Sequence, residues 1–154
     1  MIVVYINLYG TTIFIVNKKK LIMQQFVINK NSTLPYLEME AVQDGRHTYK
    51  KLYLALQSAT VTFSMTNMET GVKKIANAPC YIVPFETDCC EDKFKIQYRW
   101  NKRDTSEAGT YIGQFKIKFE NEITIEDMTF PKGELIVPIA EELQILINDG
   151  SIKV

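Results

Sequence analysis

The sequence has few of the residues that build metal sites and disulfide frameworks. Its 154 residues include a single histidine, His47, and three cysteines, of which two are adjacent. An odd number with an adjacent pair is a poor framework for a disulfide-stapled secreted domain, so we expect Cys80, Cys89 and Cys90 to be reduced thiols. With His47 they could supply four soft ligands for zinc, but the closely spaced cysteine pairs of structural zinc sites are missing. We therefore expect no metal, and we interpret the cysteines as small core hydrophobes.

The sequence also lacks an excess of charge of either sign, because lysine plus arginine and aspartate plus glutamate number 18 each. A balanced chain has no overall field to recruit nucleic acid, so we expect no nucleic-acid partner. The 23% of charged and 11% of aromatic residues also exclude an intrinsically disordered chain.

Residues that favour helices are scarce as well. There are 7 Ala and 10 Leu, against 18 Ile, 10 Val, 13 Thr and 17 aromatic residues. This balance argues against a helical bundle. With 46% hydrophobic residues, a chain of 154 residues can bury one sizeable core, so we expect a single all-β domain.

The apolar N-terminal stretch, residues 1–16, does not fit a signal peptide or a membrane span. No positive charge precedes it, polar residues and Gly10 interrupt it, and it is shorter than the roughly 20 residues that a spanning helix needs. We expect no membrane partner. Residues 3–6 and 13–16 instead predict a β-hairpin, or an extended arm that needs the sheet of a partner. A further interpretation places the biological start at Met23.

Period-two alternation dominates the chain from Ser58 onward, and it predicts half-buried strands. Three stretches, 60–66, 93–100 and 110–119, alternate almost perfectly. The side chains expected to face inward are Phe63, Met65, Phe94, Ile96, Tyr98, Tyr111, Phe115 and Ile117.

Weaker strand patterns lie at 25–29, 34–40, 52–56, 72–76, 81–85, 123–130 and 135–139. Residues 141–148 fit a strand or the start of a helix, and we favour a strand. Turn-forming residues at 67–71 and 43–46 separate some of these stretches. Short strands joined by turns predict an antiparallel β-sandwich with Greek-key links.

No arrangement typical of catalysis is visible in the sequence. Nucleophilic catalysis needs a base beside the nucleophile, and His47 lies in a polar turn with no surrounding motif. Glu120 with Glu122, or Glu126 with Asp127, could serve as glycosidase carboxylates, but acidic residues on loops are ordinary. We expect a protein that is not an enzyme, with no catalytic, metal-binding or cofactor-binding residue and no cofactor.

A short helical turn is predicted at 104–107. Asp104 can cap its exposed amides, and Glu107 three residues later can reach back as in a capping box. This turn would bridge two strands of the sandwich.

The segment that follows has the pattern of a tyrosine corner. In immunoglobulin-like sandwiches an acidic residue, a small residue and then a tyrosine mark a corner at which the tyrosine hydroxyl bonds to upstream backbone. We expect this bond from Tyr111, with Gly109 required there by its conformation. Gly113 stands two residues after Tyr111, where antibody domains carry a cysteine, so we expect packing alone to hold the sandwich.

A series of short motifs in a fixed order carries a more specific signal. It comprises Leu34-Pro35-Tyr36-Leu37-Glu38, Ala59-Thr60-Val61-Thr62-Phe63-Ser64-Met65, Tyr98-Arg99-Trp100, Asp104-Thr105, Ala108-Gly109-Thr110-Tyr111, Phe115, and Phe130-Pro131 with Gly133. In this order the motifs resemble the N-terminal immunoglobulin-like domain of bacteriophage baseplate upper proteins, a group of phage tail structural proteins. The resemblance divides the chain into an N-terminal arm or hairpin (1–23), a sandwich (24–139) and a C-terminal tail (140–154).

The resemblance implies a non-enzymatic structural virion protein of a bacteriophage tail, neck or collar ring, or baseplate. Members of that family continue into long fibre regions, whereas only about fifteen residues follow the sandwich here. A ring or collar component therefore fits better than a host-binding fibre. The implied partners are other virion proteins of the tail, the portal-proximal region or the baseplate, and the implied location is the virion after synthesis in the host cytoplasm.

The alternative function is a glycan-binding or receptor-binding sandwich used in host attachment. Exposed aromatic side chains can stack on sugars, and Tyr49, Tyr53 and Tyr81 are the candidates, although each also fits a place in the core or at its rim. A cellular adhesion or pilus module is a third interpretation.

Charge along the chain suggests a mode of assembly. Residues 1–103 carry 14 basic and 8 acidic side chains, a balance of +6, whereas residues 104–154 carry 4 and 10, a balance of −6. If the two signs segregate in the fold, complementary faces suit the head-to-tail contacts of a homo-oligomeric ring. In this hypothesis the 2–16 arm and the 143–147 tail dock on neighbouring copies.

Overall fold

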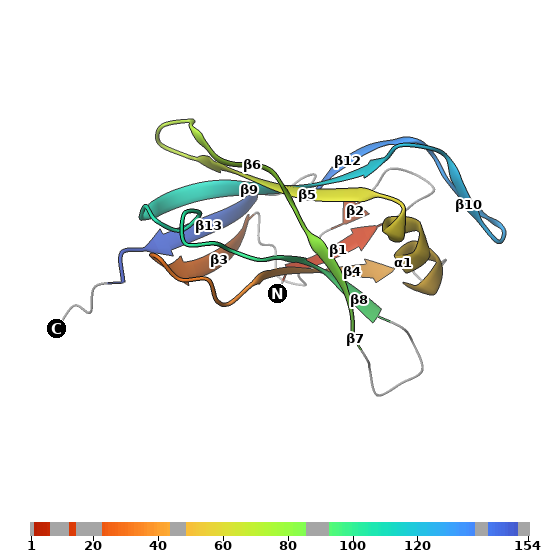
Figure 1. The fold of residues 1–154 in the computed structure, drawn as a ribbon, viewed down its shortest axis with the longest axis horizontal. Helices are drawn as coiled ribbons and strands as arrows, with labels where there is room; N and C mark the ends of the chain where they lie inside the picture. Colours follow the sequence, from red (N-terminus) through yellow and green to blue (C-terminus); the bar gives the residue numbers. More distant parts are fainter. Residues whose placement is uncertain are drawn as a thin grey trace.

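The computed structural model describes residues 2–6, 13–14, 23–43, 49–85, 93–137 and 142–150. It confirms the predicted all-β fold class, since the described chain consists of strands, their turns and one short helix (Figure 1). The strands are β1 (Ile2–Ile6), β2 (Ile13–Phe14), β3 (Met23–Asn29), β4 (Leu37–Gln43), β5 (Thr60–Asn67), β6 (Lys73–Pro79), β7 (Tyr81–Phe85), β8 (Lys93–Tyr98), β9 (Gly109–Phe119), β10 (Ile123–Ile125), β11 (Met128–Phe130), β12 (Gly133–Val137) and β13 (Glu142–Asn148). No helix in this part of the chain is long and apolar enough to cross a bilayer.

Two sheets form the layers of a sandwich. The five-stranded sheet has the order β2-β1-β4-β8-β7, and the six-stranded sheet has the order β3-β13-β9-β5-β6 with β12 also paired to β9. The strand that begins as β6 in one sheet continues as β7 in the other, with only Cys80 between them (Figure 1). The two layers are therefore joined along one side by a single extended segment.

The core lies between the sheets and consists of the alternating apolar rows of their strands. All eight side chains predicted to face inward are buried. Phe63 of β5 contacts the other layer through Tyr98, with ring centroids 4.7 Å apart, and contacts Phe115 of its own sheet at 5.1 Å. Trp100 closes this aromatic cluster by stacking on Phe26 of β3. Burial of such rings is the main stabilising contribution to the fold.

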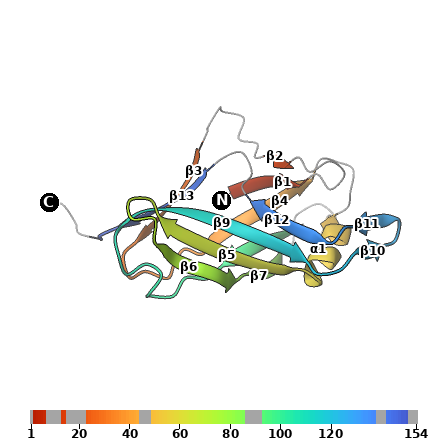
Figure 2. The ribbon, with the colours of Figure 1, turned by 90° about the horizontal axis from the view of Figure 1, so that it is seen from above.

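The predicted strand at 52–56 is wrong, because this segment lies in helix α1 (Tyr49–Gln57). Ala55 and Leu56 are buried while Leu54 is 43% exposed, which is a helical and not an alternating pattern. The segment contains no β-branched residue, so nothing in its composition opposes a helix. The helix packs on one end of the sandwich, where the ring of Tyr53 contacts that of Phe94 (Figure 2).

The single strand predicted at 123–130 is also wrong, because the chain reverses at Glu126 and Asp127. The strands β10 and β11 pair as a two-stranded hairpin, with Ile125 opposite Met128. Glu126 has a φ of 55°, which the two-residue turn requires. The hairpin stands at the same end of the molecule as α1 (Figure 2). The turn predicted at 67–71 is confirmed, and it joins the antiparallel strands β5 and β6. The Asn67 side-chain oxygen accepts hydrogen bonds from the amides of two turn residues, and Gly71 has a φ of 70°.

The strand expected at 141–148 is confirmed as β13, but it is not a tail that docks elsewhere. It lies between β3 and β9 in the middle of the six-stranded sheet. The side chains of Leu143, Ile145 and Ile147 are buried in the core of the same chain. They are therefore not free to provide contacts to a neighbouring copy.

The N-terminal segment joins the sheet of its own chain. β1 pairs with β2 as an antiparallel ladder, as expected of a hairpin, and with β4 as a parallel strand. The sandwich therefore includes residues that were expected to form an arm outside it. The turn predicted at 43–46 falls mostly outside the described residues.

Candidate interaction surface

Tyr111 forms the predicted corner. Its hydroxyl donates a hydrogen bond to the carbonyl oxygen of Glu107 across 2.9 Å. Gly109 has a φ of 153°, which side chains rarely tolerate, and a Cβ there would lie 3.6 Å from the Tyr111 ring. The glycine is therefore required by backbone conformation, as predicted.

Gly113 provides the space that the core needs beside this corner. A Cβ at this position would lie 2.9 Å from two ring carbons of Phe63 and 3.3 Å from a methyl carbon of Leu143. The Phe63 ring covers the position where antibody domains carry a cysteine. Ring packing thus occupies the space that a disulfide takes in those domains.

Asp104 has a different role from the predicted helix cap. Its carboxylate accepts hydrogen bonds from the Tyr98 hydroxyl at 2.7 Å and from the Asn101 amide at 2.9 Å. The side-chain oxygen of Asn101 takes the capping role instead, because it accepts hydrogen bonds from the backbone amides of Arg103 and Asp104. The predicted capping box at 104–107 is wrong, because a buried Tyr98 hydroxyl needs an acceptor and Asp104 turns inward to supply it. Residues 102–105 form turns without a helix.

Glu107, the other half of the predicted box, has a partner on a β-strand. It pairs with Lys74 of β6 across 3.1 Å.

Burial and the neighbouring Asp104 carboxylate raise the pKa of the Tyr98 phenol well above its usual value. The phenol therefore stays protonated as the donor of this buried pair.

Thr105 ties the corner to the loop after β3. It is fully buried, and its hydroxyl donates to the carbonyl oxygen of Ser32 at 2.8 Å. In return, the amide of Asn31 donates to the Thr105 carbonyl oxygen at 2.9 Å. The motif residues Tyr98, Asp104, Thr105, Gly109 and Tyr111 are mostly buried and lie within one segment, 98–111, and we call these five residues the corner unit.

The exposed neighbour of the corner unit is a cluster of aromatic side chains around an arginine. The Arg99 guanidinium lies 4.0 Å from the ring centroid of Tyr81 and 5.6 Å from that of Tyr36. Its Nε donates to the side-chain oxygen of Gln97 at 2.8 Å. We call these four residues, Tyr36, Tyr81, Gln97 and Arg99, the Arg99 platform.

Three neighbouring strands position the Arg99 platform, since Arg99 directly follows β8 and Tyr36 directly precedes β4. Tyr81 of β7 lies opposite Gln97 of β8, and Glu38 of β4 lies opposite Gln97 on the other side. Glu38 forms an ion pair with Lys95 at the border of the platform. The arrangement holds the guanidinium in one orientation, because both a ring face and a hydrogen bond constrain it.

The Arg99 platform presents both apolar surface and a positive charge. Tyr81 is 48% exposed and Leu34, two residues before Tyr36, is 63% exposed, whereas Gln97 is buried. Within the described part of the chain, no carboxylate pairs with Arg99. The two terminal NH₂ groups of the guanidinium are the donors left for an external acceptor.

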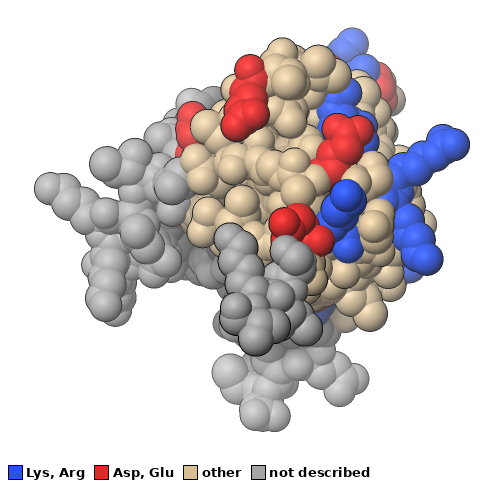
Figure 3. Space-filling model, turned by 90° about the vertical axis from the view of Figure 1, so that its left-hand side faces the viewer, with Lys and Arg blue, Asp and Glu red and all other residues tan. Residues whose placement is uncertain are grey.

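Charges of the two sequence halves mix on the surface of the fold. The pair between Lys74 and Glu107 joins one half to the other. On the face shown in Figure 3, acidic and basic side chains are interspersed. On this face, therefore, the two signs of charge do not form fully separate regions.

The other predicted candidates are distributed as follows. Tyr53 is half-buried against Phe94, which fits a place in the core, and Tyr49 begins α1. Burial raises the pKa of the Cys80 thiol to about 12, so Cys80 is protonated at neutral pH. The residues His47, Cys89 and Cys90 lie outside the described ranges. No group of three or more His, Cys, Asp or Glu side chains suited to a metal ion occurs within the described ranges.

The acidic pairs considered as glycosidase carboxylates occupy the hairpin region. Glu120 pairs with Lys118 at 3.1 Å, and Glu126 and Asp127 form the hairpin turn. Sequence reasoning missed the Arg99 platform, because alternation along 93–100 assigns Gln97 and Arg99 only to an outer, solvated face. The alignment with Tyr36 and Tyr81 depends on the register of three strands.

Comparison with known proteins gives no match: no protein-family model, no curated protein and no solved structure is significantly similar to this chain.

Proposed function

We propose that this chain is a non-enzymatic structural protein of a bacteriophage virion, acting by protein–protein assembly in the tail, the neck or collar ring, or the baseplate. The observation that carries the proposal is the corner unit. Tyr98, Asp104, Thr105, Gly109 and Tyr111 belong to the motif series that resembles the phage immunoglobulin-like domains. In the fold, the side chains of Tyr98, Asp104, Thr105 and Tyr111 are buried, and each makes a hydrogen bond that holds the segment 98–111 or the loop beside it. A structural role for each of these motif residues supports a real relationship over a chance series of weak motifs.

The strand order supports the immunoglobulin-like part of the proposal. Immunoglobulin sandwiches place strands B, E and D in one sheet and strands G, F and C in the other. The neighbours β4, β8 and β7 follow the first order, and β13, β9 and β5 follow the second. The Tyr111 corner lies at the start of β9, which corresponds to the strand that carries the tyrosine corner in that family.

The Arg99 platform supports a binding role for the exposed surface. Tyrosine and arginine are enriched at the centres of protein–protein interfaces, and their loss there is often costly. An ordered guanidinium loses little conformational entropy on binding. The partners in this proposal are other virion proteins and further copies of the chain, and the location is the virion.

One observation favours glycan binding as the second candidate function, namely the exposure of Tyr81. The contact with Arg99, however, occupies part of the Tyr81 ring surface on which a sugar would stack. Tyr53, another of the three tyrosines considered for sugar stacking, packs against Phe94. These contacts favour the assembly function over the glycan-binding function.

The proposal is tested by the composition of phage particles and by the gene neighbourhood. We expect mass spectrometry of purified virions from the encoding phage or lysogen to detect the chain, and its gene to lie among portal, tail-tube and fibre genes. We also expect the tagged chain to co-purify with tail or portal-proximal proteins. Absence from particles, with a gene among pilus or cell-wall operons, would contradict the proposal. Specific binding on a glycan array that Tyr81→Ala abolishes would favour the second function.

A further inference from the structure

The charges near the Arg99 platform differ sharply from those of the β10–β11 hairpin. Residues 99–103 carry three basic side chains, Arg99, Lys102 and Arg103, all exposed. Residues 120–130, which we call the acidic hairpin, carry four exposed acidic side chains and no basic one. The two regions therefore have opposite charge over short, continuous surface segments.

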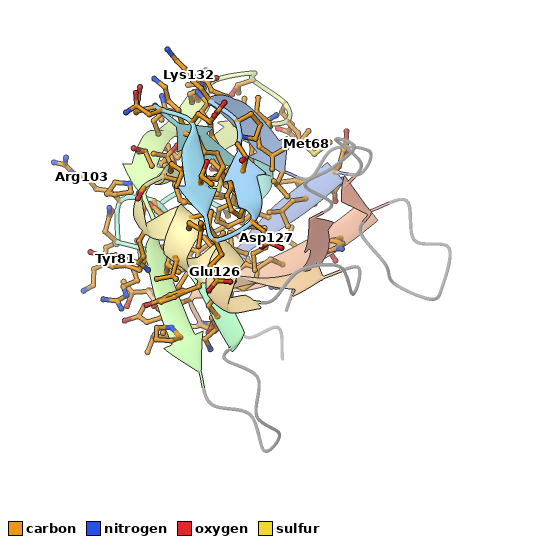
Figure 4. The ribbon with its side chains drawn as sticks, turned by 90° about the vertical axis from the view of Figure 1, so that its right-hand side faces the viewer. Met68, Tyr81, Arg103, Glu126, Asp127 and Lys132 are labelled. Carbon is orange, nitrogen blue, oxygen red and sulfur yellow. The ribbon has the colours of Figure 1, made fainter. Side chains whose placement is uncertain are left out.

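The two regions do not meet within one chain. The acidic hairpin projects at the end of the molecule that carries α1 (Figure 1). In Figure 4, Tyr81 and Arg103 extend from one side of the molecule, while Glu126 and Asp127 mark the hairpin turn in a different place. A contact between platform and hairpin therefore requires two copies.

We propose that the Arg99 platform of one copy binds the acidic hairpin of a second copy, which makes the chain assemble head to tail. The ligand class is a side-chain carboxylate presented on a β-hairpin. The carboxylate accepts hydrogen bonds from the terminal NH₂ groups of Arg99, whose Nε already bonds to Gln97. This inference rests on the proposed assembly function and names the surfaces that carry it.

Each part of the Arg99 platform has a defined role in this contact. Tyr81 and Tyr36 hold the guanidinium by cation–π contact, so the cost of ordering it is met before binding. The exposed surface of Tyr81 supplies apolar area beside the charge. Lys102 and Arg103 attract the acidic hairpin during approach, which raises the association rate more than the final affinity.

The geometry of the contact is heterologous, because two different surfaces meet. In a pair of copies, the first keeps an unused hairpin and the second keeps an unused platform. Repetition of such a contact closes into a ring when the rotation between copies allows it and forms a filament otherwise. A ring is the outcome that fits a collar or neck protein.

Sedimentation velocity of the full chain at low salt tests the proposal. We expect wild type to self-associate and added salt to weaken the association. Arg99→Glu should weaken it at least about tenfold more than Arg103→Glu, which makes the same charge change four residues away. Circular dichroism melting shows whether each variant remains folded. If Arg99→Glu makes the chain misfold, Tyr81→Leu serves as a second variant and should also weaken association.

A mixing experiment identifies the partner surface. Arg99→Glu disables the platform and Glu122→Lys weakens the hairpin, so each variant alone should be monomeric. Their mixture should form heterodimers, because the hairpin of the first variant and the platform of the second are both intact. The proposal would be overturned if the single variants associate as well as wild type does, even when heterodimers form in the mixture. It would also be overturned if both variants are monomeric and their mixture forms no heterodimers.

Two outcomes separate this inference from the proposed function. If wild type is monomeric at low salt but the chain is found in virions, this inference fails, and the partner of the Arg99 platform is another virion protein and not a second copy. If the chain associates through Arg99 but is absent from virions, the proposed function fails and the contact between copies stands.

Discussion

The hydroxyl of Tyr98 and the carboxylate of Asp104 lie 2.7 Å apart, with both side chains buried at one end of β8. The same carboxylate accepts the amide of Asn101. One carboxylate thus satisfies two donors and closes the loop that leads to the tyrosine corner. This pairing makes the loop part of the core and explains why Asp104 does not cap a helix.

Removal of the Asp104 carboxylate should destabilise the fold. In Asp104→Ala, the Tyr98 hydroxyl and the Asn101 amide lose their acceptor, and we expect unfolding free energy to fall by about 2 to 3 kcal/mol. Urea denaturation measures this loss. In the Tyr98→Phe background, the same substitution should cost less, because one of the two donors is already gone. Equal costs in both backgrounds would mean that the two side chains are not coupled.

Stability should decline in alkaline solution because of Tyr98. Its pKa in the folded state is raised well above the value of about 10 of an unfolded chain. Above pH 10 the unfolded chain releases the proton while the folded chain keeps it, so rising pH favours unfolding. Below pH 10 this contribution to stability is fully present. Tyr98→Phe should have a smaller loss of stability than wild type between neutral and alkaline pH, as measured by urea denaturation across that range.

Loss of the corner hydrogen bond should have a small and purely structural effect. Tyr111→Phe removes the bond to the Glu107 carbonyl, and we expect unfolding free energy to fall by about 1 kcal/mol. Thermal melting measures the change. Self-association of the folded variant should equal that of wild type. Unchanged stability with lost association would make Tyr111 an interface residue instead.

Gly113→Ala should destabilise the core by overpacking. The added Cβ would lie 2.9 Å from the Phe63 ring, and we expect a cost of about 1 to 3 kcal/mol. Phe63→Leu, which withdraws the ring, should reduce the cost of Gly113→Ala in the double variant. If both backgrounds show the same cost, the ring is not the obstacle. Chemical denaturation of the four proteins in this cycle gives the comparison.

Deletion of residues 1–22 should uncover an edge of the five-stranded sheet. β1 pairs with residues 39–43 of β4, so its loss leaves the backbone groups of these residues without their β1 partners. Exposed edges of this kind promote association between chains. We expect the truncated chain to aggregate more than wild type in light scattering, with an association that Arg99→Glu does not reverse. A truncated chain that stays monomeric and fully stable would show that β1 contributes little to the sheet.

The sequence alone determined the parts of the fold that depend on neighbours along the chain. Alternation places Phe63 and Phe115 on an inner face whatever strand lies opposite, because side chains of a strand point to alternate sides. The Tyr111 corner could be predicted for a similar reason, since donor and acceptor are only four residues apart. Gly109 belongs to the same local geometry.

Tertiary structure decided the features that depend on distant partners. The leucines of 52–56 fit both a strand and a helix, and the end of the sandwich selected the helix by burying Ala55 and Leu56. Asp104 could cap a turn locally, but the buried Tyr98 hydroxyl drew it inward. The Arg99 platform required the register of three strands, which no local pattern encodes. Pairing between strands brings together residues that are far apart in the sequence, so their contacts exist only once the sheets have formed.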